Sequence, residues 1–371
     1  MPDSRVFVIK IGSNSLVDAK GRLDRTFLAS VAAQLAAARK AGWQPVIVTS
    51  GAVAAGVARL GLKERPSALP ERQALAAVGQ IGLSRLWEEV LEEHGIPAAQ
   101  LLLMYDDFSH RERNQNLTAT VRALFAWGVV PVINENDPVA TQELLAVGDN
   151  DHLSALVATQ LGAEILLMLT DIDGVYDADP RENPKAKRID EIAMVTTAVL
   201  AAAGGAGLRG RGGMRSKIES ARLAAGAGVT TVIAAARAPE VVMRALRGES
   251  VGTRVRGRGQ RVDARRRWLA VARRVKGRIH VDGGAAAAVR SHGRSLLPAG
   301  VIRVEGRFAV GETVAIVDPA GTELARGLAS IAADELERIV GKRMDVAATI
   351  LGHPLPKAVV HRDDLLVLTH A

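Results

Sequence analysis

The chain has 371 residues, of which 48% are hydrophobic, and this combination predicts two folded domains and excludes a disordered protein. It contains no cysteine, which excludes disulfides, thiolate metal sites and thiol nucleophiles, and its 8 histidines lack the HExxH spacing of zinc proteases. The formal net charge is +8, but the segment from Arg254 to Arg278 alone carries +10, which leaves −2 for the remainder. The bulk of the chain is therefore not a general binder of polyanions.

The N-terminus shows no targeting pattern. It runs at once into VFVIKIG, without a basic segment followed by an apolar one, and no apolar run reaches the about 18 residues that a membrane span needs. We therefore expect a soluble, cytoplasmic protein without a membrane partner.

From the N-terminus to Gly248, short apolar β-branched runs alternate with longer Ala- and Leu-rich helical patterns. The apolar runs are continuous, which is typical of parallel strands covered by helices on both faces. We therefore predict an α/β fold, an αβα three-layer sandwich with a mainly parallel sheet. The predicted strands are Val6–Ile11, Pro45–Val48, Gln100–Met104, Val129–Ile133, Ile165–Leu169 and Val229–Ile233. The predicted helices are Thr26–Ala41, Pro70–Glu93, Asn114–Trp127, His152–Leu161 and Met214–Ala225.

The pattern changes after Gly248. Basic residues from Arg254 onward lead into short strand-like pieces separated by Gly and Pro: RIHVDGGAAAAV, GVIRVEG, ETVAIVD and ELARGLAS. They predict a small β-rich domain from about Gly277 to Gly352 with one short helix, Asp334–Val340. We expect a first domain over residues 1–253, a basic connector over 254–276, and the small domain with its C-terminal tail over 277–371.

Two strand ends near the N-terminus carry groups suited to anions. The run VIKIGSNS ends a strand with Lys10 and then turns through Gly and Ser, which suits a phosphate bound by an ammonium and by backbone N–H groups. The run VTSGAVAAG places Ser50 and Gly51 at a helix start, whose free N–H groups bind carboxylate or phosphate. Taken alone, a surface lysine beside a turn and a tight strand–helix turn explain these motifs as well.

The stretch Val132–Asp151, VINENDPVATQELLAVGDND, is the most informative part of the chain. A strand ends in Asn134 and Asp137, and a second polar group that includes Asn150 precedes a helix. Open α/β sheets bind ligands at this carboxyl edge. Amides and carboxylates accept from an ammonium, and amides donate to a carboxylate, which suits a small zwitterion. A polar loop with a helix cap is the simpler explanation, but two polar groups around one loop favour a ligand site.

Two later motifs add groups suited to a nucleotide. Gly210–Lys217, GRGGMRSK, opens a helix with glycines and places a lysine one turn inward, although no GxxxxGK[ST] loop occurs in the chain. The run LTDIDGVY ends a strand in Thr170 and Asp171, which form either a turn or a nucleotide-facing edge. Together the motifs place two lysines, a Gly-rich helix start and an acid–amide group at strand ends of one sheet, the combination that phosphoryl transfer needs.

Seven motifs resemble, in this order, those of the glutamate 5-kinase family of the amino acid kinase superfamily: VIKIGSNSL, IVTSGAVAAG, LAAVGQ, VPVINENDPVAT, VGDNDHLSAL, LLMLTDIDGVY and GGMRSK. The resemblance runs nearly end to end, with RRRW at Arg265–Trp268 and a C-terminal segment, SLLPAGVIRVEGRFAVGE, that is similar to a PUA domain. The INEND and VGDND pair distinguishes this family from carbamate, aspartate and nucleotide kinases. The resemblance implies an amino acid kinase fold followed by a PUA-like domain.

The resemblance also implies an activity, the ATP-dependent phosphorylation of the L-glutamate γ-carboxylate for proline synthesis. Lys10 and Lys217 would neutralise the transferring phosphoryl group, and Asp151 would orient both lysines without abstracting a proton, because the γ-carboxylate is already ionised. Mg²⁺ would bind through the nucleotide phosphates. Glutamate would be held by Ser50, Asn134, Asp137 and Asn150. ATP would be held by Lys10, Thr170, Asp171, Arg211, Gly212, Gly213, Met214, Arg215, Ser216 and Lys217.

Family members are typically inhibited by L-proline and form homo-oligomers, so a dimer or tetramer is expected. The chain departs from the family pattern at Arg211, where a small or hydroxyl residue is expected, and at Arg215. Two alternatives stay open: a kinase for another acidic amino acid, and an RNA-binding protein that uses the basic segment and the PUA-like domain in a salt-sensitive manner. A solvated linker explains the basic segment more simply, and an RNA adaptor has no use for the kinase motifs.

Overall fold

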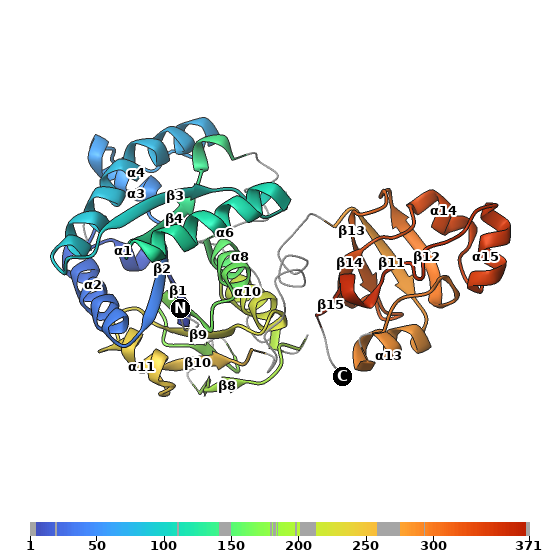
Figure 1. Ribbon diagram of the computed structural model, residues 1–371. Coiled ribbons are helices and arrows are strands. Elements are labelled where there is room, and N and C mark those ends of the chain that lie inside the picture. The colour runs from blue at the N-terminus through green and yellow to red at the C-terminus, as the bar shows by residue number, and fades with distance from the viewer. Residues whose placement is uncertain are drawn as a thin grey trace. The chain divides into compact units, whose positions relative to one another are not determined.

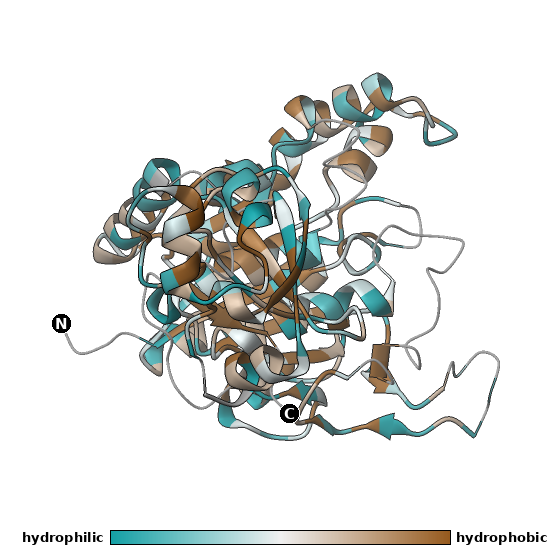
Figure 2. Cartoon of the chain, turned by 90° about the vertical axis from the view of Figure 1, so that its right-hand side faces the viewer, coloured by the Kyte–Doolittle hydropathy of each residue, from teal (hydrophilic) through white to brown (hydrophobic). Residues whose placement is uncertain are grey.

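The computed structural model describes residues 5–18, 21–109, 111–140, 150–178, 180, 183, 185–196, 199–200, 213–257, 275–292 and 294–368. The chain divides into two compact units, one of Met1–Asp107 with Glu112–Gly259 and one of Phe108–Arg111 with Gln260–Ala371. Each unit has its own hydrophobic core. Hydrophobic residues follow the strands, whereas the helices carry both hydrophobic and hydrophilic residues (Figure 2).

The described residues of the first unit form an eight-stranded sheet in the order β3-β4-β2-β1-β5-β9-β10-β8. The pairs from β3 to β9 are parallel, β10 is antiparallel to β9, and β8 is parallel to β10, so the predicted mainly parallel sheet is confirmed. The strands are β1 Arg5–Ile11, β2 Trp43–Val48, β3 Ala98–Leu103, β4 Val130–Glu135, β5 Ile165–Thr170, β8 Glu191–Ile192, β9 Thr230–Ala235 and β10 Gly252–Val255, with β6 Val175–Tyr176 and β7 Arg188–Ile189 forming a separate hairpin pair.

Helices cover both faces of this sheet, which confirms the three-layer prediction (Figure 1). One layer contains α2, α4 and α11, and the other contains α8 and α10, which pack on each other and on β1, β5 and β9. The helices are α1 Ser13–Leu16, α2 Arg25–Lys40, α3 Ala52–Leu60, α4 Leu69–Glu92, α5 Tyr105–Ser109, α6 Arg111–Ala126, α8 Asn150–Leu161, α10 Met214–Gly226 and α11 Val241–Arg247, with a 3₁₀ turn, η1, at Asp137–Val139.

The pleat of β1 decides which layer each of its side chains meets. Phe7 and Ile9 belong to the core that includes the α2 residues Leu28 and Leu35. Lys10 has the opposite parity, so its side chain points to the other layer, where it reaches α8. A lysine on the central strand is therefore placed beneath the N-terminus of α8.

Helices α3 and α4 pack so closely that their backbones touch. A Cβ atom on Gly79 would lie 1.9 Å from the Ala52 carbonyl oxygen and 2.4 Å from the Gly56 nitrogen, and one on Gly56 would lie 2.0 Å from the Leu75 oxygen. Only glycine fits at these two positions. This contact holds α4 beside the turn that follows β2.

The second unit is β-rich, as predicted, with a five-stranded sheet in the order β12-β11-β13-β14-β15 among the described residues. Its elements are β11 Gly277–Val281, α13 Gly283–His292, β12 Val301–Gly306, β13 Thr313–Val317, β14 Glu323–Leu328, α14 Ala333–Arg338, α15 Met344–Leu351 and β15 Leu365–Val367, with 3₁₀ turns η2 Pro298–Gly300 and η3 Arg362–Asp364.

Three predictions about the second half of the chain need correction. The piece RIHVDGGAAAAV is a strand only to Val281 and then forms α13, because Asp282 caps the helix by accepting from the Ala285 N–H at 2.7 Å and alanine favours helix. The sequence analysis expected one helix after Gly277 and did not predict α15. Arg254, expected to begin the connector, instead pairs within the first sheet as part of β10.

None of the helices described is long and apolar enough to span a membrane.

Candidate active site

Two buried lysines meet one buried aspartate at the carboxyl edge of the first sheet. Lys10 Nζ, at the end of β1, lies 2.6 Å from Asp151 Oδ1, and Lys217 Nζ, in the first turn of α10, lies 2.9 Å from Asp151 Oδ2. The Asp151 side chain is 1% exposed, and those of Lys10 and Lys217 are 7% and 8% exposed. The structure thus brings together the three residues for which the resemblance implies a catalytic role.

The electrostatics of this group keep its carboxylate ionised. Burial by itself would raise the pKa of Asp151, but the two ammonium groups outweigh it and hold the pKa below its usual value. Two positive charges around one carboxylate leave a net positive charge in a buried place, and an anionic phosphoryl group is the natural counterion.

A second group, made of amides and a hydroxyl, lies beside the first. Asn150 Nδ2 donates to Ser50 Oγ at 2.8 Å and to Asn134 Oδ1 at 3.1 Å. Ser50 follows β2, Asn134 lies on β4, and Asn150 begins α8. We call these three residues the amide group, and the two lysines with Asp151 the lysine group. Because Asn150 and Asp151 are consecutive, the two groups meet at the start of α8.

Asp137, the fourth expected glutamate ligand, lies on η1 directly after β4. Gln73 of α4 holds this turn, since its Nε2 donates to the Asp137 carbonyl at 3.1 Å and to the Ala140 carbonyl at 2.8 Å. Gln80, about two turns further along α4, accepts from Asn134 Nδ2 at 2.8 Å. The sequence analysis gave neither glutamine a role, and the only signal for Gln80 was its place in the motif LAAVGQ.

Thr170 and Asp171 end β5 next to the turn that follows β1. Asn14 Nδ2 donates to Asp171 Oδ2 at 3.2 Å, and Thr170 Oγ donates to Asp171 Oδ1 at 3.0 Å. Burial alone would raise the pKa of Asp171, but these two hydrogen bonds lower it below its usual value. Asn14, which the sequence analysis did not single out, therefore ties the β1 turn to the β5 end.

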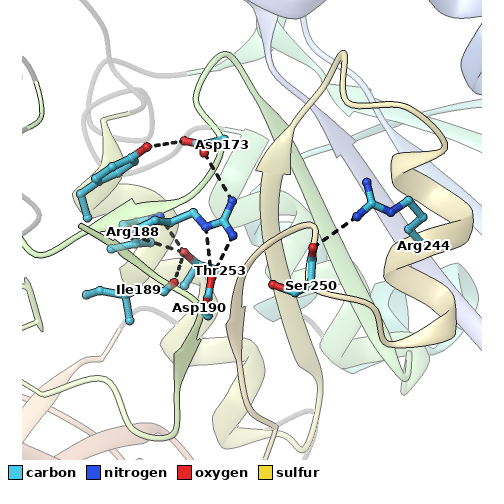
Figure 3. A network of polar contacts seen from close by, with 9 residues as sticks. Asp173, Arg188, Ile189, Asp190, Arg244, Ser250 and Thr253 are labelled. Carbon is cyan, nitrogen blue, oxygen red and sulfur yellow. Dashed lines mark hydrogen bonds and ion pairs between the residues drawn. The ribbon is translucent and has the colours of Figure 1, made fainter. Parts of the chain in front are cut away.

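The chain beyond Asp171 is fixed by a polar network that Figure 3 shows. Arg188 lies 3.4 Å from Asp173 and 2.9 Å from Asp190 as an ion pair with each. Thr253 accepts from the Val175 N–H at 2.7 Å and donates to the Ile189 carbonyl at 2.6 Å. This network anchors the β6–β7 hairpin to β10 and fixes the path of the chain after the strand end that carries Thr170 and Asp171.

The glycine-rich motif is described in part. Gly213 is the N-cap of α10, and Met214, Arg215 and Ser216 form the first turn of that helix with Lys217. Arg211 and Gly212 lie outside the described residues. Arg215 pairs with Glu219 at 3.0 Å, and its side chain is 56% exposed. This departure from the family pattern thus forms a surface ion pair on α10.

Comparisons with known proteins identify the family of each part of the chain. Residues 5–235 match the family model for the amino acid kinase family, and residues 277–350 match the model for the PUA domain. The carbamate kinase from Giardia lamblia bound to AMP-PNP superposes with a TM-score of 0.50 at 17% sequence identity, over 70% of this chain and 100% of that chain. This likeness shows the shared fold.

Relatives are similar over almost their whole length. The glutamate 5-kinase of Herpetosiphon aurantiacus is 47% identical over 360 residues, 97% of each chain. The glutamate 5-kinase of Chromohalobacter salexigens is 46% identical over 365 residues, 98% of this chain and 96% of the relative. The chain belongs to the amino acid kinase family, in the branch whose curated relatives are named glutamate 5-kinase, and it carries a C-terminal PUA domain.

Proposed function

We propose that the protein transfers the γ-phosphoryl group of ATP to the γ-carboxylate of L-glutamate, the first step of proline biosynthesis. The observation that carries this proposal is the meeting of two sites at Asn150 and Asp151. The amide group, whose side chains suit an amino acid, lies next to the lysine group, whose charges suit a phosphoryl group. The names of the relatives supply the substrate.

The reaction forms one bond and breaks one. A γ-carboxylate oxygen attacks the γ-phosphorus of ATP, the bond from that phosphorus to the β–γ bridging oxygen breaks, and ADP leaves. The attacking carboxylate is ionised near pH 7, so no general base is needed. Lys10 and Lys217 would neutralise charge on the transferring group, and Asp151 would hold both ammonium groups in place.

The amino acid would be bound by groups of both polarities. Asn150 and Asn134 offer amide groups, Ser50 a hydroxyl and Asp137 a carboxylate, which together suit one ammonium and one carboxylate. ATP would lie along the β5 end and the first turn of α10, near Thr170, Asp171, Gly213, Met214, Arg215 and Ser216.

Mg²⁺ would accompany ATP, bound mainly through the phosphates. The residues at the β5 end fit such an ion, because the exposed Asp171 carboxylate is a hard oxygen ligand. Burial alone would raise the pKa of this carboxylate, but its hydrogen bonds lower the pKa below its usual value, so it is ionised near pH 7. When bound, the ion would neutralise phosphate charge and orient the phosphates.

Acceptor-dependent formation of ADP tests this function. The purified protein with MgATP should form ADP with L-glutamate and far less with N-acetylglutamate or L-aspartate. Turnover with another acidic amino acid but not with glutamate would support the related-kinase alternative, and no acceptor-dependent turnover would overturn the kinase proposal.

Several further expectations belong to this proposal. They are inhibition by L-proline, assembly into a homo-oligomer, a cytoplasmic location, and the division into a catalytic domain that includes β10, a basic connector that begins after β10, and a PUA-like domain over residues 277–371. RNA binding is a second candidate function, supported by the PUA match over residues 277–350 and by the basic connector. It predicts binding to RNA that weakens steeply as the salt concentration rises.

A further inference from the structure

A line of polar side chains continues from the amide group into α4. Asn134 Nδ2 donates to Gln80 Oε1 at 2.8 Å, Gln80 Nε2 donates to Ser84 Oγ at 3.0 Å, and Ser84 Oγ donates to Gln100 Oε1 at 2.6 Å. We call Asn150, Asn134, Gln80, Ser84 and Gln100 the amide relay. It runs from buried Asn134, 2% exposed, and Gln80, 9% exposed, to the exposed Gln100 on β3.

A backbone N–H fixes the direction of this relay. The Glu135 N–H donates to Asn134 Oδ1 at 2.9 Å, and a backbone N–H can only donate. Asn134 must therefore keep its oxygen on that side and turn its Nδ2 toward α4. Gln80 meets this Nδ2 with its oxygen, because its own Nε2 is held by Ser84.

The fixed direction of Asn134 in turn fixes Asn150. Asn134 Oδ1 can only accept, so Asn150 must present its Nδ2 there, and the same Nδ2 donates to Ser50 Oγ. The Asn150 Oδ1 atom therefore points away from Ser50 and Asn134. It is buried, and no donor among the described residues reaches it.

A buried acceptor without a donor is costly unless a ligand supplies one. An ammonium supplies N–H donors and no acceptor. An ionised carboxylate has only acceptors, so it cannot donate a hydrogen bond to this oxygen and is repelled by it. The acceptor site thus selects a ligand with an ammonium beside Asn150. The side chains that orient this acceptor are Asn134, one hydrogen bond from Asn150, and Gln80, two hydrogen bonds from it.

We propose that Gln80 is a positioning residue that sharpens this selectivity: it holds the Nδ2 side of the Asn134 amide, whose oxygen side is held by the Glu135 N–H, and so keeps Asn150 in place to present an acceptor to the α-ammonium of the substrate. This inference rests on the proposed function for the identity of the substrate. Gln80 acts through Asn134. Without the Gln80 oxygen, the Asn134 amide is held only at its own oxygen by the Glu135 N–H, so Asn134 and the Asn150 amide that donates to it are positioned less firmly.

The test compares two ligands that differ only in the ammonium. L-glutamate and glutarate share both carboxylates, and binding of each to the full-length protein is measured by titration calorimetry for the wild type, for Gln80→Met and for Gln34→Met. Methionine keeps the length and helix propensity of glutamine and removes its hydrogen bonds. Gln34 is the control, since within the described part of the chain its amide bonds to the Ser30 carbonyl and the Val242 N–H, both far from the relay in sequence.

The expected result is a change in selectivity. In Gln80→Met the preference for glutamate over glutarate should fall about tenfold, as for loss of one hydrogen bond to a charged group, while Gln34→Met keeps the wild-type preference. Equal loss of affinity for both ligands, or no loss for either, would overturn the inference. Glutamate-dependent ADP formation by the wild type is measured separately: its absence overturns the proposed function, whereas an unchanged preference in an active enzyme overturns only the role of Gln80.

Discussion

Asp151 is the residue on which the two buried lysines depend. It contacts Lys10 with one carboxylate oxygen and Lys217 with the other, and all three side chains are almost fully buried. The burial of two ammonium groups is tolerated because the carboxylate lies between them. The same arrangement leaves one net positive charge for a phosphoryl group.

Asp151→Asn should therefore destabilise the protein, because it removes the one carboxylate that contacts both buried ammonium groups. The expected loss is about 3–5 kcal/mol in the free energy of unfolding, the usual range for breaking a buried ion pair. Denaturant unfolding at pH 7 measures it, with Asp334→Asn on the exposed start of α14 as the control. A loss no larger than that of the control would contradict this account of Asp151.

The pH dependence of that loss has a definite sign. Burial would raise the pKa of Asp151, but Lys10 and Lys217 lower it below the usual value of 3.8. A lowered pKa contributes stability that is fully present above the unfolded-state value and is lost only as the pH falls through the folded-state value. The difference between the wild type and Asp151→Asn should stay constant from pH 7 to pH 5, and a decline within that range would show a raised pKa instead.

At the residue scale, the sequence identified groups that end strands or begin helices. Lys10, Asp151 and Lys217 were predictable because each follows a recognisable strand or opens a recognisable helix in a known motif. Gln73 and Gln80 were not, since they lie inside α4, where a glutamine is an ordinary surface residue until the packing of that helix is known. Asn14 was not, because its partner Asp171 is 157 positions away.

At the element scale, the position of α4 depends on its glycine contact with α3. Gly79 precedes Gln80, so any shift of α4 at this contact also moves the member of the amide relay that accepts from Asn134. The contact is between backbones, and side-chain rearrangement cannot relieve a Cβ atom placed there.

Gly79→Ala should therefore cost about 1–3 kcal/mol in the free energy of unfolding and raise the KM for glutamate. Gly82→Ala in the same helix is the matched control, since its nearest neighbour is an Arg59 side-chain nitrogen at 4.0 Å. That control should gain about 0.5–1 kcal/mol from helix propensity and leave the KM unchanged. Thermal unfolding and initial rates measure both variants, and equal effects of the two substitutions would contradict the importance of the contact.

The errors of prediction at this scale concern segments that lack a long and uniform apolar run. The long alternation of strands and helices in the first unit was predicted well, because each element is long and its apolar run is uniform. The segment Gly283–His292 was misassigned because a run of alanines has no periodicity, and its helix is set by the cap at Asp282. The last two strands at one side of the sheet, β10 and β8, were missed because they contain only four and two residues.

At the scale of the whole molecule, the chain has two units with separate cores. All the described residues of the candidate site belong to the first unit. The second unit therefore contributes no described residue to the lysine group, the amide group or the amide relay.

Scanning calorimetry should accordingly show two unfolding transitions. A nonhydrolysable ATP analogue with Mg²⁺ at about 100 times its Kd should stabilise only one of them, by about 2.7 kcal/mol, because it binds only one unit. Lys217→Ala should weaken that shift and identify the transition as that of the first unit. A single transition, or an equal shift of two, would contradict the expectation that the two cores unfold separately.

The central claim is that Asn150 and Asp151 join an acceptor site to a phosphoryl site, and steady-state kinetics of two variants tests it most directly. Lys217→Ala should lower kcat by orders of magnitude, because it removes a charge that acts on the transferring group. Asp137→Ala should mainly raise the KM for glutamate and change kcat little. The opposite pattern, with Asp137→Ala abolishing turnover and Lys217→Ala only weakening glutamate binding, would contradict the assignment of the two sides.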